Sequence, residues 1–356
     1  MDRIAELLDD ALARGIGSAA AVSIGDAGVE VERIVRGRTR RVPDVGDPID
    51  DRAWFDLASL TKPIATVASA MVLVGEGRLD LDDAIARWIP ASPSAGTVRQ
   101  LLGHAAGCIA HVEFFKTMRD RAYADPRAAL LELVLDVPAD PPGVATVYSD
   151  LGYIQLGVIV ERAAGLPLEQ AYAELVAGPL GLAAYFPGTR ALATAVATEI
   201  DDWRGAVVGL VHDENAYYAG GVCGHAGLFA TIGDVARFAQ AFVETHADRA
   251  HGRLLPAIVR QFASESGAPA TTWRLGFDTP SLEPGVSHAG DRWPRVGAIG
   301  HTGFTGTSMW LDLPRRRWVV VLTNRVHPTR FGTSADDIKA LRRAVNDAAF
   351  EVLEHR

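Results

Sequence analysis

The sequence predicts a fold of the α/β (α+β) class, an antiparallel sheet flanked by helices and joined to a mainly helical lobe. Three observations support this: strand patterns near the amino terminus, strand patterns again in the last third, and an Ala- and Leu-rich stretch with Pro and Gly breaks over about 80–200. Strands from both ends that enclose a helical insertion indicate a single domain over 1–356. We expect its sheet lobe at about 1–58 and 215–356, and its helical lobe at about 59–214.

The amino-terminal elements follow from the spacing of apolar residues. Such residues recur at helical spacing from Ile4 to Leu12, which predicts a helix over 2–14. Runs rich in Ala, Val and Ile then predict two strands, Ala19–Ile24 and Val29–Val35, joined by a short turn.

A further helix is predicted to begin close to Ser59 and to continue to Gly75. Pro63 sets its start, because proline fits only the first turn of a helix. Lys62 then shares a face with Ser59, since three residues make nearly one helical turn.

The last third returns to strand patterns before a closing helix. Thr231 and Asp234 form a near-capping box ahead of another helix. Strands are predicted over 308–313 and 318–323, and the final helix over 336–352.

Composition and charge exclude several classes of partner. The chain has 356 residues, 48% hydrophobic and 22% charged, with a net charge of −9. This charge argues against nucleic acid or an anionic membrane, because both require a basic face. The longest apolar stretch, 63–74, is too short for a bilayer, and the acidic amino terminus does not resemble a signal peptide. We expect a cytoplasmic protein, without disulfides or a metal site at Cys108 and Cys223.

The most informative motif is Ser59-Leu60-Thr61-Lys62. Only three of the 35 basic residues are lysines, and Lys62 is one of them. Arginine cannot give up its proton, whereas a desolvated lysine can. A serine hydroxyl is a poor nucleophile until a neighbouring base takes its proton. The pair therefore indicates a nucleophilic serine beside a lysine base.

Two further motifs follow in the chain, Tyr148-Ser149-Asp150 and His301-Thr302-Gly303. With Ser59-x-x-Lys62 they stand in the order of the Ser-x-x-Lys, Tyr-x-Asn and Lys-Thr-Gly motifs. The chain thus resembles the serine β-lactamase and penicillin-binding protein superfamily, in the branch of class C β-lactamases, D-alanyl-D-alanine peptidases and related esterases. The segment 101–107 adds a weaker match. The resemblance implies a β-lactamase/transpeptidase-like fold.

The resemblance also implies roles for the motif residues. Ser59 would attack an acyl carbonyl, and Lys62 would share the serine's proton with a lowered pKa. Tyr148 would be the partner base, able to act as phenolate only where cations stabilise it. His301 would lie with these catalytic residues. The backbone N–H groups of Ser59 and Phe304 would form the oxyanion hole.

The resemblance implies a substrate-binding set of Asp150, Thr302, Gly303 and Phe304. One residue of this set, Asp150, and one catalytic residue, His301, depart from the family pattern. Asp150 replaces asparagine, so an amide donor becomes an acceptor when ionised. His301 replaces lysine, so a fixed cation becomes a group that is mostly neutral at pH 7. Both changes favour neutral esters over penicillins and D-alanyl-D-alanine peptides.

We therefore expect a cofactor-independent serine hydrolase without a metal, most simply an esterase acting on small carboxylic esters. Its partner would be a small ester, amide or lactam; the sequence makes no prediction of an oligomeric state. Two alternatives stay open: a D-alanyl-D-alanine carboxypeptidase or weak class C-type β-lactamase, and a catalytically silent ligand sensor on the same fold.

Each residue also has a structural interpretation. Ser59 and Asp150 could cap helices, Tyr148 could be a core tyrosine bonded to the backbone, and His301 could be structural. His104 and His225 lie in Gly- and Ala-rich loops, where turn-fixing hydrogen bonds are favoured over catalysis.

Two other segments are weak candidates for ligand sites. The run 212–214 is His-Asp-Glu, but consecutive residues rarely converge on one metal. The glycines of 220–227 lack the Gly-Lys-Ser/Thr of a phosphate loop. No Gly-x-Ser-x-Gly occurs, which excludes the α/β-hydrolase nucleophile elbow.

Overall fold

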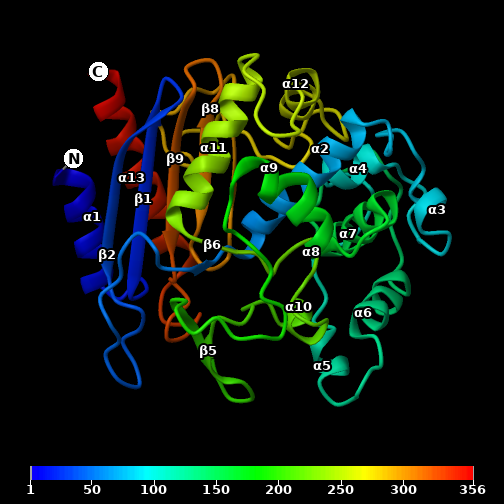
Figure 1. Cartoon of the computed structure of the whole chain (residues 1–356), viewed down its shortest axis with the longest axis horizontal. Coiled ribbons are helices and arrows are strands. Elements are labelled where there is room, and N and C mark those ends of the chain that lie inside the picture. Colours follow the sequence, from blue (N-terminus) through cyan, green and yellow to red (C-terminus); the bar gives the residue numbers. More distant parts are fainter. Residues whose placement is uncertain (1, 356) are drawn as a thin grey trace.

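The centre of the molecule is a five-stranded antiparallel sheet with strand order β2-β1-β9-β8-β7. The computed structural model describes residues 2–355. The two strands from the amino terminus lie beside three from the last third, so both parts of the chain build one sheet (Figure 1). The strands are β1 (Ala19–Asp26), β2 (Val29–Gly37), β7 (Ala298–Thr302), β8 (Ser308–Asp312) and β9 (Arg317–Thr323).

Helices cover both faces of this sheet. α1 (Asp2–Ala13) and α13 (Ala335–Glu354) pack together on one face, and α11 (Ile232–His246) lies on the other (Figure 1). Successive side chains of a strand point to opposite faces, so β9 contributes to two apolar cores. Val319 belongs to the core with α1 and α13, and Trp318 to the larger core with α11.

The other half of the molecule is mainly helical (Figure 1). Its longest helix is α7, in which the Ser149 hydroxyl accepts a hydrogen bond from the N–H of Gly152 at 3.0 Å and so caps the first turn. The helices are α3 (Ile85–Trp88), α4 (Val98–Leu102), α5 (Phe115–Met118), α6 (Pro126–Leu135), α7 (Asp150–Ala164), α8 (Leu168–Tyr172), α9 (Gly178–Leu180), α10 (Glu214–Tyr218) and α12 (Pro256–Ser264), with a π-helical turn at Ala173–Ala177.

Two small sheets were not predicted from the sequence. β3 (Phe55–Asp56) pairs with β6 (Phe229–Ala230), directly before the Ser59 segment. β4 (Ala197–Asp201) and β5 (Gly205–Val208) form a hairpin that begins where only helices and loops were expected. Strands of two to five residues carry too little alternation to be recognised by pattern.

The helix predicted from Ser59 to Gly75 is present, but it is not a regular α-helix throughout. A 3₁₀ turn (Ala58–Leu60) leads into a π-helical segment (Lys62–Val67) and then into α2 (Ala68–Gly75). By length and composition the 18 residues Ala58–Gly75 could cross a membrane, with a mean hydropathy of 1.4, yet 83% of the segment is buried inside the protein. It is a core element of this fold.

The remaining predicted elements are present with bounds shifted by one or two residues. Thr231 and Asp234 form the capping box that was expected for α11. A second capping box, from Ser334 and Asp337, begins α13 one residue earlier than predicted. Such shifts arise because caps and not apolar spacing decide where a helix begins.

Candidate active site

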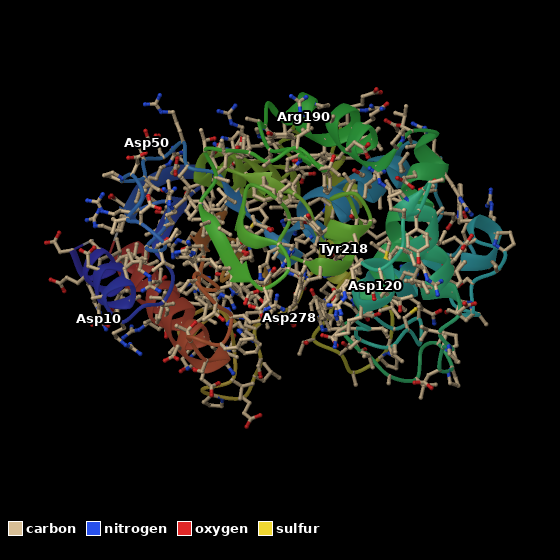
Figure 2. All side chains as sticks on the ribbon, turned by 90° about the horizontal axis from the view of Figure 1, so that it is seen from below. Asp10, Asp50, Asp120, Arg190, Tyr218 and Asp278 are labelled. Atoms are coloured by element: carbon tan, nitrogen blue, oxygen red, sulfur yellow. The ribbon has the colours of Figure 1, made fainter. Side chains whose placement is uncertain are left out.

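A cavity of about 690 Å³ opens between the sheet and the helical half. Asp278, on its wall, lies near the middle of the molecule when the chain is viewed from below (Figure 2). Seven of the eight predicted site residues line this cavity: Ser59, Tyr148, Asp150, His301, Thr302, Gly303 and Phe304. Three distant segments of the chain therefore converge, as the order of the motifs predicted.

A buried carboxylate fixes the turn that carries Ser59. The Oδ1 of Asp56 accepts from the N–H of Ala58 at 2.8 Å, and its Oδ2 accepts from the N–H of His212 at 2.6 Å. Ala58 has a positive φ of 47°, a conformation that non-glycine residues rarely adopt. The strained turn leaves Ser59 partly exposed to the cavity.

Lys62 is fully buried behind Ser59 and contacts three other residues of the predicted site. Its Nζ donates to the Ser59 Oγ at 3.1 Å, to the Tyr148 Oη at 2.7 Å and to the Asp150 Oδ1 at 2.7 Å. The Tyr148 hydroxyl therefore bonds the Lys62 side chain and not the backbone, unlike a structural core tyrosine.

The charges of this cluster are set by Asp150. Burial alone would lower the pKa of Lys62, but the attraction of Asp150 and Tyr148 exceeds this effect and the pKa is raised. Burial raises the pKa of the Tyr148 phenol, and Lys62 offsets this only in part. Although burial opposes ionisation of Asp150, Lys62 and His111 hold the pKa of its carboxyl well below the usual range.

The expectation of a lowered lysine pKa is therefore wrong. It rested on desolvation and on neighbouring positive charge. Desolvation is present, but the nearest charged neighbour of Lys62 is the Asp150 carboxylate. At neutral pH the cluster holds an ammonium, a carboxylate and a neutral phenol. Asp150 also does not cap α7, because Ser149 occupies the N-cap position.

His301 lies at the end of β7 as a neutral imidazole. Burial lowers its pKa to about 3. Its Nδ1 lies 2.8 Å from the Thr302 carbonyl, which can only accept, so Nδ1 carries the proton. The Nε2 lone pair has no partner among the described residues. The position that holds lysine in the family pattern thus presents no cation.

The two expected oxyanion donors lie on segments that are tied together. The Thr305 hydroxyl donates to the Asp56 carbonyl at 2.8 Å, and the Thr307 hydroxyl donates to the Leu57 carbonyl at 3.0 Å. Within residues 2–355 the N–H groups of Ser59 and Phe304 donate to no other group. Both are therefore free for a ligand, as an oxyanion hole requires.

Gly303 makes this close approach of the two segments feasible. A Cβ at this position would lie 2.6 Å from the Leu57 carbonyl oxygen and 3.4 Å from the Ala58 Cβ. Only glycine avoids the first contact, so residue 303 can lie directly against Leu57, two residues before Ser59.

Among the residues that sequence reasoning missed, two contact the predicted Tyr148–Asp150 pair. The His111 Nδ1 donates to the Asp150 Oδ2 at 3.1 Å, so Asp150 bridges His111 and Lys62. Trp273 lines the cavity and packs against Tyr148, with ring centroids 5.4 Å apart. Both residues lie in irregular segments outside any motif, and no pattern in the sequence marks them.

The structural interpretation of His104 is confirmed. Its Nδ1 accepts from the N–H of Ser149 at 3.1 Å, and its carbonyl accepts from the N–H of Val147, so it holds the residues on both sides of Tyr148. His225 instead pairs through Nε2 with the Asp213 Oδ1 at 2.9 Å. Burial would lower the pKa of His225, but Asp213 raises it to about 10.

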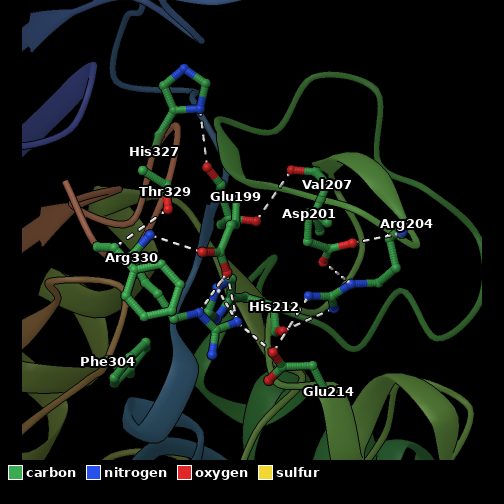
Figure 3. A network of polar contacts seen from close by, with 12 residues as sticks. Glu199, Asp201, Arg204, Val207, His212, Glu214, Phe304, His327, Thr329 and Arg330 are labelled. Atoms are coloured by element: carbon green, nitrogen blue, oxygen red, sulfur yellow. Dashed lines mark hydrogen bonds and ion pairs between the residues drawn. The ribbon is translucent and has the colours of Figure 1, made fainter.

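A network of charged groups supports the wall beside Phe304 (Figure 3). Arg330 forms ion pairs with Glu199 and Glu214. The His212 Nε2 lies 2.9 Å from the Glu199 Oε2, and the His212 ring stacks on Phe304 with centroids 5.7 Å apart. Consecutive residues of the 212–214 run thus have different partners, and in the described chain no three His, Cys, Asp or Glu side chains gather as a metal would require.

The chain matches the family model described as "Beta-lactamase" over residues 4–344. It belongs to the β-lactamase family. The family assignment rests on almost the whole chain, so it covers the sheet, the helical half and all three motifs.

Curated relatives of this β-lactamase-family chain carry a peptidase name. A "Putative D-alanyl-D-alanine carboxypeptidase" of Escherichia coli K12 is 32% identical over 308 residues, which cover 77% of this chain and 69% of the relative. A protein of the same name from Salmonella enteritidis is 30% identical over 310 residues, with the same two coverages.

Solved structures share the fold. EstCE1, described as a hydrolase with promiscuous acyltransferase activity, superposes with a TM-score of 0.71 at 24% identity, covering 97% of this chain and 98% of its own. The penicillin-binding protein homologue from Pyrococcus abyssi gives 0.74 at 19% identity, covering 99% and 77%. The β-lactamase/transpeptidase-like fold expected from the sequence is therefore confirmed, and the protein is an enzyme, a serine hydrolase of this family.

Proposed function

We propose that the protein is an esterase that forms an acyl-enzyme on Ser59. The observation that carries the proposal is the contact of Lys62 with both Ser59 and Tyr148, in a cavity that also presents two free backbone N–H groups. Such a cavity contains a nucleophile, a proton relay and donors for the oxyanion, which are the parts that acyl transfer needs.

The charges of the site suggest how the proton moves. Because Tyr148 is neutral at rest, its own proton first passes to the departing alcohol oxygen, and its oxygen, which then carries the developing negative charge, takes the proton of Ser59. The Ser59 Oγ bonds to the acyl carbon, the ester C–O bond breaks, and the alcohol leaves protonated. Lys62 stabilises the negative charge that develops on the phenol oxygen during this transfer. Water repeats the sequence in reverse for deacylation.

The substrate class follows from the two departures from the family pattern. Asp150 is engaged by Lys62 and His111, so it offers no amide donor to a peptide carbonyl. His301 is neutral and offers no cation to a carboxylate. Trp273 and Phe304 add apolar surface to the cavity. These features favour a neutral ester with an apolar acyl group.

Intact-mass spectrometry after exposure to a fluorophosphonate and to a short-chain aryl ester tests this function. We expect covalent adducts on the wild type and none on Ser59→Ala. Hydrolysis of the aryl ester that persists in purified, folded Ser59→Ala would disprove the proposal.

A second candidate function is that of a D-alanyl-D-alanine carboxypeptidase. The names of the relatives favour it. One observation in the cavity does so as well: Arg325 lines it and forms no ion pair with a carboxylate in the described chain, so it could bind the carboxylate of a peptide. Release of D-alanine from a D-alanyl-D-alanine peptide at a rate above that of aryl-ester hydrolysis, lost in Arg325→Ala, would favour the peptidase over the esterase.

A further inference from the structure

Two buried arginines hold the loop between β7 and β8. Arg342, on α13, is 5% exposed, and Arg325, after β9, is 6% exposed. Within residues 2–355 neither forms an ion pair, although a buried cation ordinarily has an acidic partner. Both arginines instead donate hydrogen bonds to main-chain carbonyls of the loop.

The contacts of Arg342 converge on the start and the end of the loop. Its Nη2 donates to the Gly303 carbonyl at 2.6 Å and to the Thr307 carbonyl at 2.8 Å, and its Nε donates to the Gly306 carbonyl at 3.3 Å. Arg325 differs, because its Nε donates to the Phe304 carbonyl at 2.8 Å.

The Gly303 carbonyl and the Phe304 N–H belong to one peptide unit. In a trans peptide these two groups point in opposite directions. A guanidinium that holds the carbonyl from the α13 side therefore directs the N–H away from α13. Gly303 itself lies against Leu57 and Ala58, and Phe304 and Ser59 line the same cavity; the side away from α13 is therefore the side of Ser59.

We propose that Arg342 positions and polarises the Gly303–Phe304 peptide, so that the Phe304 N–H is a stronger oxyanion donor than an ordinary amide. This inference rests on the proposed acyl-enzyme function. A cation bonded to the carbonyl draws electron density from the N–H, because hydrogen bonds polarise the groups they connect. Since no carboxylate neutralises Arg342, its field also reaches the oxyanion.

The protein tolerates an unfavourable environment to keep this contact. Burial, together with the charge of Arg325, lowers the pKa of Arg342 to about 9. A purely structural tie between α13 and the loop could be made by a neutral side chain without this penalty. A role in oxyanion stabilisation explains why the side chain at this position is charged, whereas a hydrogen bond alone would not require a charge.

The test measures the acyl-enzyme carbonyl directly. The wild type, Arg342→Gln and Arg342→Lys are acylated with a ¹³C-carbonyl-labelled aryl ester whose acyl group leaves slowly, and the carbonyl stretch is read by infrared difference spectroscopy. Gln keeps a donor without charge, whereas Lys keeps the charge. We expect the band to move to higher wavenumber in Arg342→Gln and less in Arg342→Lys.

Deacylation rates provide the second readout. Removal of a whole oxyanion donor costs about 10²–10³ in kcat, so a weakened donor in Arg342→Gln should slow single-turnover deacylation by about 10- to 100-fold. Arg325→Gln is a comparison and not a silent control, because Arg325 lines the cavity and bonds the carbonyl of the next peptide; its acyl band should move less than that of Arg342→Gln. Arg343→Gln, whose side chain bonds Ser287 and Asp291, controls for α13 itself.

The outcomes separate the two proposals. Absence of an acyl band in the wild type overturns the acyl-enzyme function. An acyl band that is the same in the wild type and Arg342→Gln, or that moves equally in Arg325→Gln, overturns the role of Arg342 alone. If Arg342→Gln does not fold, Arg342→Met decides, because it removes the charge without burying a new polar group: a band and a rate equal to those of Arg343→Gln reject the inference.

Discussion

The wall of the cavity around Ser59 and the wall around Phe304 differ in how their charges are balanced. Around Ser59, Lys62 pairs with Asp150, and His225 pairs with Asp213. Around Phe304, Arg330 pairs with Glu199 and Glu214, whereas Arg325 and Arg342 bond only main-chain carbonyls of the described chain.

The difference fits two parts of one reaction. A balanced cluster can pass a proton from one oxygen to another without creating net charge in a buried site, where an unpaired charge is costly. An unbalanced positive wall favours the step in which negative charge appears on the acyl oxygen.

Removing the nucleophile should have the largest effect. Ser59→Ala is expected to lower kcat for an aryl ester by roughly 10⁴-fold or more, because loss of a catalytic serine removes the covalent path. Thermal unfolding should change little, since one hydroxyl at the cavity surface contributes little packing. The measurement is the burst and steady-state rate of aryl-alcohol release, with the unfolding curve as the control for folding.

Changing Lys62 should be nearly as damaging. Lys62→Met removes the donor to both Ser59 and Tyr148, and a relay of this kind contributes about 10²–10⁴-fold. Lys62→Arg should be similar, because the larger planar guanidinium cannot place its donors where the fully buried Nζ bonds both Ser59 and Tyr148. The acylation rate by stopped flow decides; an arginine variant with most of the wild-type rate would mean that any cation at this position suffices, whatever its geometry.

The motifs predicted which residues meet, but not how they are paired. Ser59 and Lys62 are three residues apart, so the sequence alone placed them on one face. Asp150 lies 88 positions from Lys62, and a Tyr-Ser-Asp motif does not tell whether its carboxylate faces a substrate or the lysine. The structure shows that it faces Lys62, which reverses the predicted direction of the lysine pKa shift.

Asp150 and His301, the two departures from the family pattern, should affect which substrates the enzyme accepts more than the rate of ester hydrolysis. Asp150→Asn with His301→Lys restores an amide donor and a permanent cation. Each charged hydrogen bond is typically worth about 1.5–3 kcal/mol, and tenfold in rate needs about 1.4 kcal/mol. Acylation by a penicillin should therefore rise by one to a few factors of ten relative to an aryl ester. Loss of Asp150 also removes what raises the pKa of Lys62, so the basic limb of the rate profile should move to lower pH.

An unchanged penicillin-to-ester ratio in the double variant would show that the cavity wall sets specificity. Asp150→Asn alone is the control for the altered Lys62, because it changes the lysine's partner without adding a cation.

Contacts between a side chain and the main chain could not be predicted from the sequence. The helix that carries Arg342 was predicted, yet its bonds to carbonyls 35 to 39 positions away leave no pattern of residue types. His111 was missed for a related reason: it lies in a loop, and only the folded chain brings it to Asp150. Periodicity detects elements and motifs detect chemistry, whereas these contacts depend on how the elements pack.

The smallest effect should come from His111, which connects Asp150 to solvent. Its hydrogen bond to Asp150 raises the pKa of His111 above its usual value of 6.5. A group whose pKa is raised on folding adds stability that is fully present below the unfolded pKa and is lost as the pH rises through the folded pKa. The Tm difference between the wild type and His111→Gln should therefore be largest below about pH 6.5 and fall at higher pH.

The expected effect is small. The His111 side chain is 42% exposed, so water screens the pair to a few tenths of a kcal/mol, or about 1 °C in a chain of this size. In the Asp150→Asn background the pH dependence of this difference should vanish, since the partner is gone. A difference that stays constant from pH 5 to pH 9 in the wild-type background would show that His111 does not sense the charge of Asp150.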